Sequence, residues 1–371
     1  MNKGQSPASV SSAVAAALRE PTLMLGAGVS VGLFLAMGLL PIFGVLFGIF
    51  TPLPLLVFYC RRGRVFGLTM IGSAVLGVTL IYSILGRPLG IFFFIECCVL
   101  AVVLGEGFRF RLTPEKMVGY PAGVLLVLGL TVIVLTGWTQ GRNPWTFGQA
   151  MVESQLRASF MVYESVLDGS GAKQTPGIQD NGLSGPEPLP ERTMGEPVLG
   201  REDVPGRPEQ GLPGQLPEMN AVVQFMVGIF PGLMVMGVLL IAWANFMMSR
   251  LILVKTGWLP SGLTDLKTWS APEKLIWVLI AAGFAMFAPM NWLRLMAMNG
   301  LVVLGLIYFF HGLCVVAFWL NSKKASPFLR ITAYSLIALQ QYLALMVAAL
   351  GLFDMWFDFR KMKKAEPGPT A

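Results

Sequence analysis

The chain has 371 residues, of which 55% are apolar and only 13% are charged. An ordinary soluble domain carries about a quarter charged residues, and a soluble fold of this length has too small an interior to hide so many apolar side chains. Lipid removes this difficulty because apolar residues can face it. The composition therefore excludes an ordinary soluble protein and predicts a membrane protein whose first partner is the lipid bilayer.

The formal net charge of +7 is carried by short clusters of Lys and Arg that lie beside apolar runs. Clusters of this kind orient membrane helices. The sequence has no basic face with interleaved aromatic residues, which nucleic-acid binding would require. We therefore expect no nucleic-acid partner.

The first predicted segment, residues 1–22, is polar and contains a short surface helix over Ser9–Arg19. The apolar stretch that follows, Leu23–Cys60, is too long for one membrane helix. It is interrupted by three prolines, at Pro41, Pro52 and Pro54. Because proline breaks helices, we expect one helix to about Leu40 and a second, broken helix that ends at Arg61.

Three further apolar runs complete an N-terminal membrane region over residues 23–142, namely Val65–Leu85, Leu89–Leu104 and Val118–Gly137. Two pairs of glycines in this region, Gly28–Gly32 and Gly44–Gly48, have the GxxxG spacing that lets helices approach closely. The pairs predict tight helix packing.

Residues 143–167 differ from the runs before them, because apolar residues recur there at helical spacing between charged and polar ones. This pattern predicts an amphipathic helix that lies on the membrane surface or packs over the bundle. Residues 168–218 hold nine Pro and ten Gly in 51 positions and no aromatic residue. Such a segment buries too little apolar surface to offset its ordering entropy, so we predict a disordered loop.

Residues 219–371 form the C-terminal membrane region and end in a basic tail. They contain four apolar runs, at Ala221–Met248, Leu275–Met290, Leu301–Leu320 and Ile331–Phe353. The predicted fold class is therefore all-α, a polytopic membrane helix bundle with eight or nine apolar segments.

The positive-inside rule orients this bundle with its N-terminus in the cytoplasm. With nine crossings, the basic clusters at 61–64, 109–116, 250–274 and 323–330 all fall inside. The tail contradicts this scheme, because Arg360 and the lysines after it would lie outside. Either one apolar run does not cross, or the end of the last helix lies along the interface.

Ionisable and polar residues inside membrane runs are the candidates for function, since a charge at a helix centre costs roughly 2.5–3.5 kcal/mol. The candidate ligand-binding residues are Glu96, His311, Asn245 and Arg294. Glu96 could bind a cation, a proton or a substrate amine, or it could be protonated or paired to lock two helices together. His311 and Asn245 could also be hydrogen-bonded contacts between helices.

Two motifs of known enzyme classes are missing. The single histidine excludes an HExxH metal site, and the sequence contains no nucleotide-binding GxxxxGK[ST]. We therefore expect a protein that is not an enzyme, with no catalytic residues, no cofactor and no metal. Transport by this chain would need energy from a separate ATPase.

Several stretches of the sequence resemble a known family. They are TPLPLLVFYCRRGR at Thr51–Arg64, FPGLMVMGVLL, TWSAPEKLIWVLI, FFHGLCVVAFWL and, most specific, GLFDMWFDFRK at Gly351–Lys361. They are similar to the YybS-like family of predicted multi-pass bacterial membrane proteins, a family of unknown function. The resemblance implies a location in the bacterial cytoplasmic (inner) membrane. It also implies an organisation similar to the substrate-capture subunits of energy-coupling-factor transporters, an analogy of fold that does not fix function.

Two functional hypotheses follow. The first is a small-solute binding or transport subunit that is energised by a partner and captures its solute near Glu96. The second is a non-transporting scaffold or assembly factor that docks other membrane or envelope proteins. In the closing motif, Asp354 and Asp358 fall on one helix face, which is typical of a solvated helix end that anchors the chain at the membrane, or else of a docking site for a partner.

Overall fold

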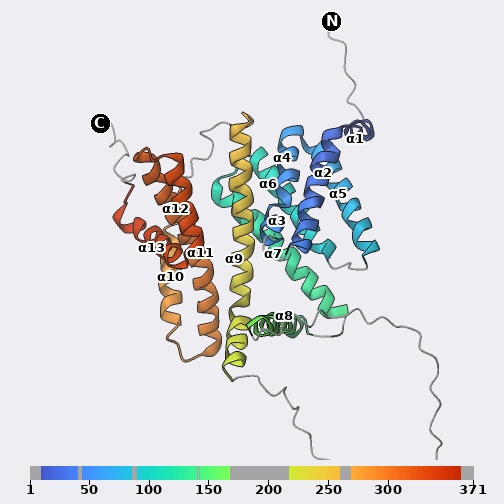
Figure 1. Cartoon of the computed structure of the whole chain (residues 1–371). Helices are drawn as coiled ribbons and strands as arrows, with labels where there is room; N and C mark the ends of the chain where they lie inside the picture. Colours follow the sequence, from blue (N-terminus) through green and yellow to red (C-terminus); the bar gives the residue numbers. More distant parts are fainter. Residues whose placement is uncertain are drawn as a thin grey trace, which may run out of the picture. The chain divides into compact units, whose positions relative to one another are not determined.

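The computed structural model describes residues 10–40, 44–85, 90–139, 141, 143–167, 217–259 and 269–360. All regular secondary structure in these ranges is helical, which confirms the predicted all-α class (Figure 1). Most of the loop predicted to be disordered, and the basic tail beyond Arg360, lie outside the described residues.

The N-terminal region contains seven helices, with bounds that follow the predicted runs. They are α1 (Val10–Leu18), α2 (Pro21–Leu39), α3 (Gly44–Phe50), α4 (Pro52–Arg62), α5 (Arg64–Ile84), α6 (Gly90–Arg109) and α7 (Pro114–Thr139). The later helices are α8 (Pro144–Leu167), α9 (Pro217–Lys255), α10 (Lys274–Ala285), α11 (Asn291–Ser322), α12 (Pro327–Leu339) and α13 (Gln341–Phe357).

Seven segments of the described chain are long and apolar enough to cross a membrane. They are α2, the α3–α4 pair, α5, α6, α7, α9 and α11. The count is eight if α12 and α13, which are bent by 104° where they meet, form one broken span. The higher of these two counts equals the lower of the two predicted ones, eight.

Two compact units divide the chain, residues 1–136 with 229–371, and residues 137–228. In the smaller unit, α8 confirms the helix predicted over 143–167. The Asn143 side chain accepts a hydrogen bond from the Trp145 N–H at 2.9 Å, which caps the helix start. Arg157 pairs with Glu153 one turn away at 2.8 Å.

The break predicted at the prolines lies at Thr51, between α3 and α4. Proline has no N–H, so carbonyl oxygens near the break need other donors. The buried Thr51 hydroxyl donates to the Phe47 carbonyl at 3.0 Å. Asn245 on α9 donates to the Ile49 carbonyl at 2.8 Å. Broken helices persist at membrane depth only where such groups are covered by protein, and here side chains of the same bundle supply the cover.

The main apolar core of the larger unit joins α2 and α4–α7 with α9. Its largest fully buried side chains include Phe94, Phe246 and Met70. Gly44 and Gly48 lie against Met37 of α2, so this GxxxG pair packs closely as predicted. Gly28 and Gly32 do not, because a Cβ added at either would have no described atom within 4 Å.

The C-terminal runs depart from straight crossings. The run Leu275–Met290 forms only the 12-residue α10, whose rise of about 18 Å is shorter than the ~30 Å hydrocarbon core. A turn then leads into α11, which runs antiparallel to α10 (Figure 1). The run Ile331–Phe353 is divided at Gln340 between α12 and α13. One of the two explanations for the conflict at the basic tail was an apolar run that does not cross the membrane, and it stays a prediction.

Helices α11 and α13 approach closely at two glycines. A Cβ on Gly312 would overlap the backbone carbonyl of Val347, and a Cβ on Gly351 would overlap the backbone of Tyr308 and Gly312. The crossing therefore requires glycine on both helices, as is common in membrane bundles.

This crossing predicts that alanine substitution at two glycines of α11 changes the stability of the protein to different extents. Gly312→Ala should destabilise the protein by about 1–3 kcal/mol, because the added methyl group forces the helices apart. Gly305→Ala is the matched control, since its Cβ would have no described neighbour within 4 Å. Thermal unfolding in detergent measures both, and equal midpoints for the two variants would contradict the tight crossing.

Candidate functional site

The structure places the four candidate residues in four separate environments. Glu96 lines a small cavity, His311 belongs to a buried charged network, and Asn245 stabilises the break between α3 and α4. Arg294, near the start of α11, is exposed, and its side chain makes a long contact of 3.4 Å to the Ala288 carbonyl. The candidates therefore do not form one site, and each is assessed by its own surroundings.

Glu96 lies in the first half of α6 and faces a cavity of about 120 Å³ between α6, α7 and α9. The other lining residues carry no charge: they are Phe93, Cys97, Leu100, Leu125, Leu126, Gly129, Met234, Val238 and Ile241. A Cβ added at Gly129 would lie 3.7 Å from the Glu96 Oε1 atom, so this glycine leaves room beside the carboxyl group. No basic side chain among the lining residues compensates the charge of Glu96.

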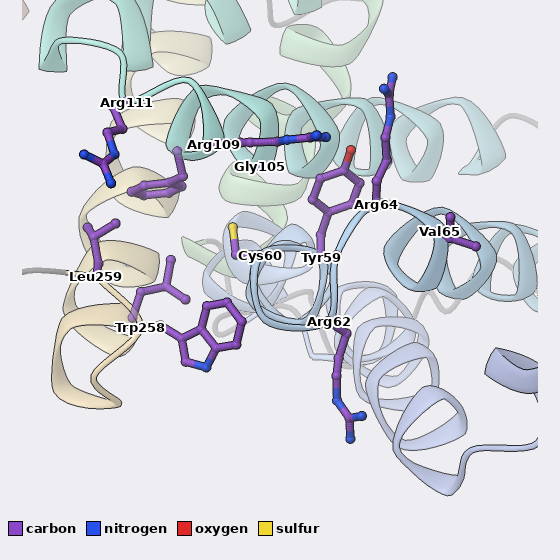
Figure 2. Close-up of a pocket in the computed structure, with 13 residues that line it drawn as sticks. Tyr59, Cys60, Arg62, Arg64, Val65, Gly105, Arg109, Arg111, Trp258 and Leu259 are labelled. Atoms are coloured by element: carbon purple, nitrogen blue, oxygen red, sulfur yellow. The ribbon is translucent and has the colours of Figure 1, made fainter. Parts of the chain in front are cut away.

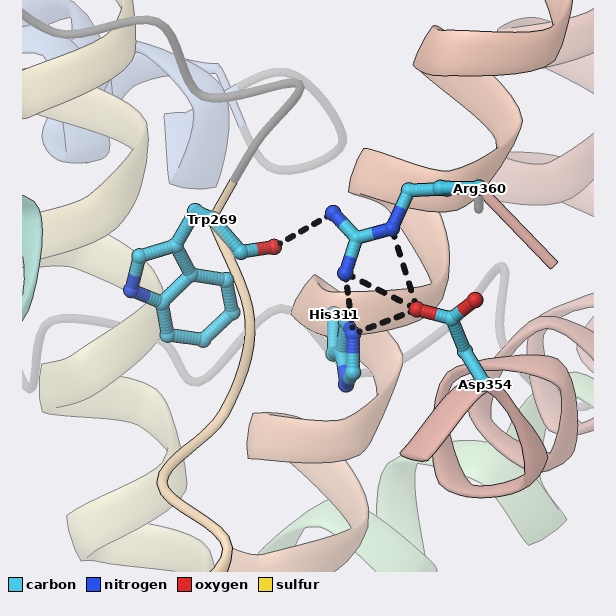
Figure 3. A network of polar contacts seen from close by, with 4 residues as sticks. All are labelled: Trp269, His311, Asp354 and Arg360. Carbon is cyan, nitrogen blue, oxygen red and sulfur yellow. Dashed lines mark hydrogen bonds and ion pairs between the residues drawn. The ribbon is translucent and has the colours of Figure 1, made fainter. Parts of the chain in front are cut away.

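The buried network joins α11, α13 and the residues that follow α13 (Figure 3). His311, Asp354 and Arg360 are each at most 5% exposed. Arg360 Nε and Nη2 lie 3.0 and 2.8 Å from Asp354 Oδ2, which makes a close ion pair. The His311 Nε2 atom lies 3.1 Å from the same oxygen. The Asp354 carboxylate therefore receives polar contacts from both other members.

Arg360 also tethers the irregular segment before α10. Its Nη1 atom donates to the Trp269 carbonyl at 2.8 Å, and the Trp269 ring meets His311 edge-on at 6.1 Å (Figure 3). Non-helical backbone inside a membrane protein needs such a partner. On its other side, Trp269 donates its indole N–H to Glu115, at the start of α7, at 2.5 Å. The network thus connects the residues that follow α13 to α7 through Trp269.

The proton positions in the network are limited by geometry. His311 Nε2 also lies 2.9 Å from Arg360 Nη2, and one nitrogen cannot donate to Asp354 and accept from Arg360 at the same time. His311 Nδ1 and Asp354 Oδ1 are buried without a hydrogen-bond partner among the described residues. The ion pair with Arg360 is therefore the dominant contact of Asp354, and the imidazole packs beside it.

The expectation of a solvated helix end is wrong for Asp354 and Arg360, which are buried at the α11–α13 crossing. Asp354 and Asp358 also do not share a helix face as expected. The helix α13 ends at Phe357, and Asp358 caps it in the left-handed conformation with φ 43°. The sequence did contain a signal for a buried charged network. Asp354 and His311 each interrupt an apolar run, and a charge in such a run needs a partner.

Asn245 forms a hydrogen-bonded contact between helices, which is one of the two interpretations considered for it from the sequence. Its amide group donates to Ile49 and also to Ile241, one turn back on α9, at 2.8 and 2.9 Å. Both donor hydrogens are therefore used within the bundle. This leaves Glu96 as the one candidate of the four whose charged group faces an apolar cavity.

Removing both partners of the ion pair should cost less stability than the two single removals added together. Asp354→Asn leaves the Arg360 charge buried, and we expect a loss of about 3–5 kcal/mol in the free energy of unfolding. The double variant Asp354→Asn/Arg360→Gln should lose less than the sum of the single losses, because the two groups are directly coupled. Chemical unfolding in detergent measures the cycle. Additive losses would contradict the coupling.

Comparison with known proteins adds one match. A family model described as "Predicted membrane protein (DUF2232)" matches residues 28–180 and 206–355, well over half of the chain. No curated protein and no solved structure matches it. With its membrane-length apolar helices, the chain is a multi-pass membrane protein that belongs to this family of predicted membrane proteins.

Proposed function

We propose that the chain is a solute-binding subunit of a transport system in the bacterial cytoplasmic membrane, and that Glu96 binds the charged group of a small cationic solute. The observation that carries the proposal is a carboxyl group in a membrane-length helix that faces a cavity lined otherwise by uncharged residues. Ionisable groups in such helices are costly, and they usually face a partner or a functional cavity.

The chemistry of the cavity supports a small amine or a monovalent cation. Its volume of about 120 Å³ exceeds the roughly 10–15 Å³ needed by one water molecule and falls below the roughly 300–1,000 Å³ of sites for drug-sized ligands. A primary amine could pair with Glu96 while its short carbon chain contacts Leu100 and Leu125. The solute is therefore expected to be small, positively charged and partly apolar.

The energy for transport is assigned to a separate protein. The sequence contains no nucleotide-binding GxxxxGK[ST] motif, and we assign no catalytic step to the chain. A partner ATPase would supply the energy, in the manner of the energy-coupling-factor systems to which the family has been likened. The partner would act on a chain that has already captured its solute.

One observation favours the alternative, a membrane scaffold. Gly28 and Gly32 on α2 have no described atom within 4 Å of an added Cβ, so this GxxxG face is free to receive another helix. The scaffold would use this face and would not need the charge of Glu96. The two functions therefore differ in what Glu96→Gln should do.

Glu96→Gln should abolish solute binding and leave folding intact, because it removes the charge and keeps the shape of the side chain. The assay is thermal unfolding of the protein in lipid nanodiscs with a panel of small primary amines and monovalent cations. At a concentration of about 100 Kd, a bound solute stabilises the wild-type protein by about 2.7 kcal/mol. The variant should show no such gain.

Two further variants sharpen this test. Glu153→Gln makes the same chemical change on α8, outside the cavity, and should respond like the wild type. Gly129→Val fills the space beside Glu96 and keeps the charge, so it should weaken solute binding as well. If no compound of the panel stabilises the wild-type protein, or if Glu96→Gln responds equally, the solute-binding proposal fails.

A further inference from the structure

A second cavity, of about 590 Å³, lies where four membrane-length segments end (Figure 2). The end of α4, the start of α5, the end of α6 and the end of α9 with the turn after it contribute its walls. Its volume is in the range of binding sites for small organic molecules. Neither Glu96 nor the buried network lines it.

Four arginines give this cavity its charge. Arg62, Arg64, Arg109 and Arg111 all line it, and no lining residue is acidic (Figure 2). Two carboxylates lie close to these arginines. Glu20 pairs with Arg62 at 3.1 Å. Glu106 accepts a hydrogen bond from Tyr59 and lies 3.5 Å from Arg64 and 3.9 Å from Arg109. The two pairs with Glu106 are long, and the Arg64 and Arg109 side chains stay more than 60% exposed. The cavity therefore keeps an excess of positive charge and unused N–H donors.

Arg111 adds an independent observation. It follows the end of α6 in the left-handed conformation, with φ 52°, at a position where glycine is usual. The Leu112 N–H bonds to the Gly107 carbonyl at 3.1 Å, as in a Schellman motif. An arginine costs backbone strain there that a glycine would avoid. Its side chain lines the cavity and forms no ion pair within the described part of the chain.

The rest of the wall is apolar and suits a lipid. Trp258, Leu253 and Phe108 line the same cavity as the arginines. Tryptophan is enriched at the membrane–water interface, and basic clusters gather on the cytoplasmic side. That leaflet carries the anionic lipids, and basic pockets between membrane helices bind their headgroups. The wall thus offers arginines for a phosphate and an apolar surface for acyl chains.

We infer that this arginine-lined cavity is a specific site for the headgroup of an anionic phospholipid, with the phosphate held by the guanidinium groups. Arginine matches phosphate through paired N–H donors, and such charge-assisted hydrogen bonds are the strong ones. The acyl chains follow Trp258 and Leu253. The site is separate from the Glu96 cavity and does not depend on the solute proposal.

Arg111→Gly is the decisive variant, because its effects on folding and on lipid binding should have opposite signs. Glycine relieves the left-handed strain, so the thermal midpoint in phosphatidylcholine should stay equal or rise. Affinity for phosphatidylglycerol should fall about tenfold, since a charge-assisted contact to the phosphate is lost. Native mass spectrometry of the delipidated full-length protein, titrated with each lipid, gives the affinity of the tightest site.

The chain offers a matched control at another helix end. Lys324 follows α11 with φ 49°, also as a basic residue in the left-handed conformation, and it lies outside the cavity. Lys324→Gly removes one positive charge and relieves the same backbone strain. It should leave the tightest phosphatidylglycerol site unchanged.

Two outcomes would overturn the inference. One is equal binding of phosphatidylglycerol to the wild-type protein and to Arg111→Gly, with Arg64→Gln/Arg111→Gln equally without effect. The other is complete displacement of phosphatidylglycerol by an equal concentration of soluble glycerol phosphate, which would assign the site to a free phosphate compound. Retained phosphatidylglycerol in the presence of glycerol phosphate, and weaker binding in both arginine variants, supports the lipid site.

Discussion

The absence of water in the bilayer core is the constraint on which the rest of this structure depends. Every backbone carbonyl and N–H group inside the bundle needs a partner from the protein itself, and every charge needs a partner other than water. Where α3 and α4 separate, Thr51 and Asn245 supply donors to exposed carbonyls. Where the chain is irregular before α10, Arg360 donates to Trp269. Thr51, Asn245 and Arg360 thus satisfy carbonyls where the regular helical structure is interrupted.

Three groups of charges meet this constraint in different ways. Asp354 and Arg360 neutralise each other beside His311 at the tight crossing of α11 and α13, which is a structural arrangement. Glu96 faces a cavity whose lining is otherwise uncharged, and in the proposed function a bound cation compensates its charge. The arginines at the helix ends exceed their nearby acids and can be balanced by lipid phosphate. The ion pair is thus observed, and the solute-bound and lipid-bound charges are the two that we propose.

Much of the fold could be predicted from composition and periodicity, because the length of an apolar run is set by the membrane. The proline break near Thr51 and the helix over 143–167 followed from the sequence. The short α10 and the 104° bend at Gln340 did not, since apolar runs look alike whatever their geometry. The pairing of His311 with Asp354 joins residues far apart in sequence, so hydropathy could flag each one but could not match them.

The most direct test of the account is to identify what occupies the Glu96 cavity in the cell. The protein would be purified gently from its membrane and denatured, and the released small molecules would be quantified by mass spectrometry. The account predicts one small amine or cation per chain, missing from the same preparation of Glu96→Gln. A stoichiometric envelope protein with no small molecule released would contradict it and would favour the scaffold.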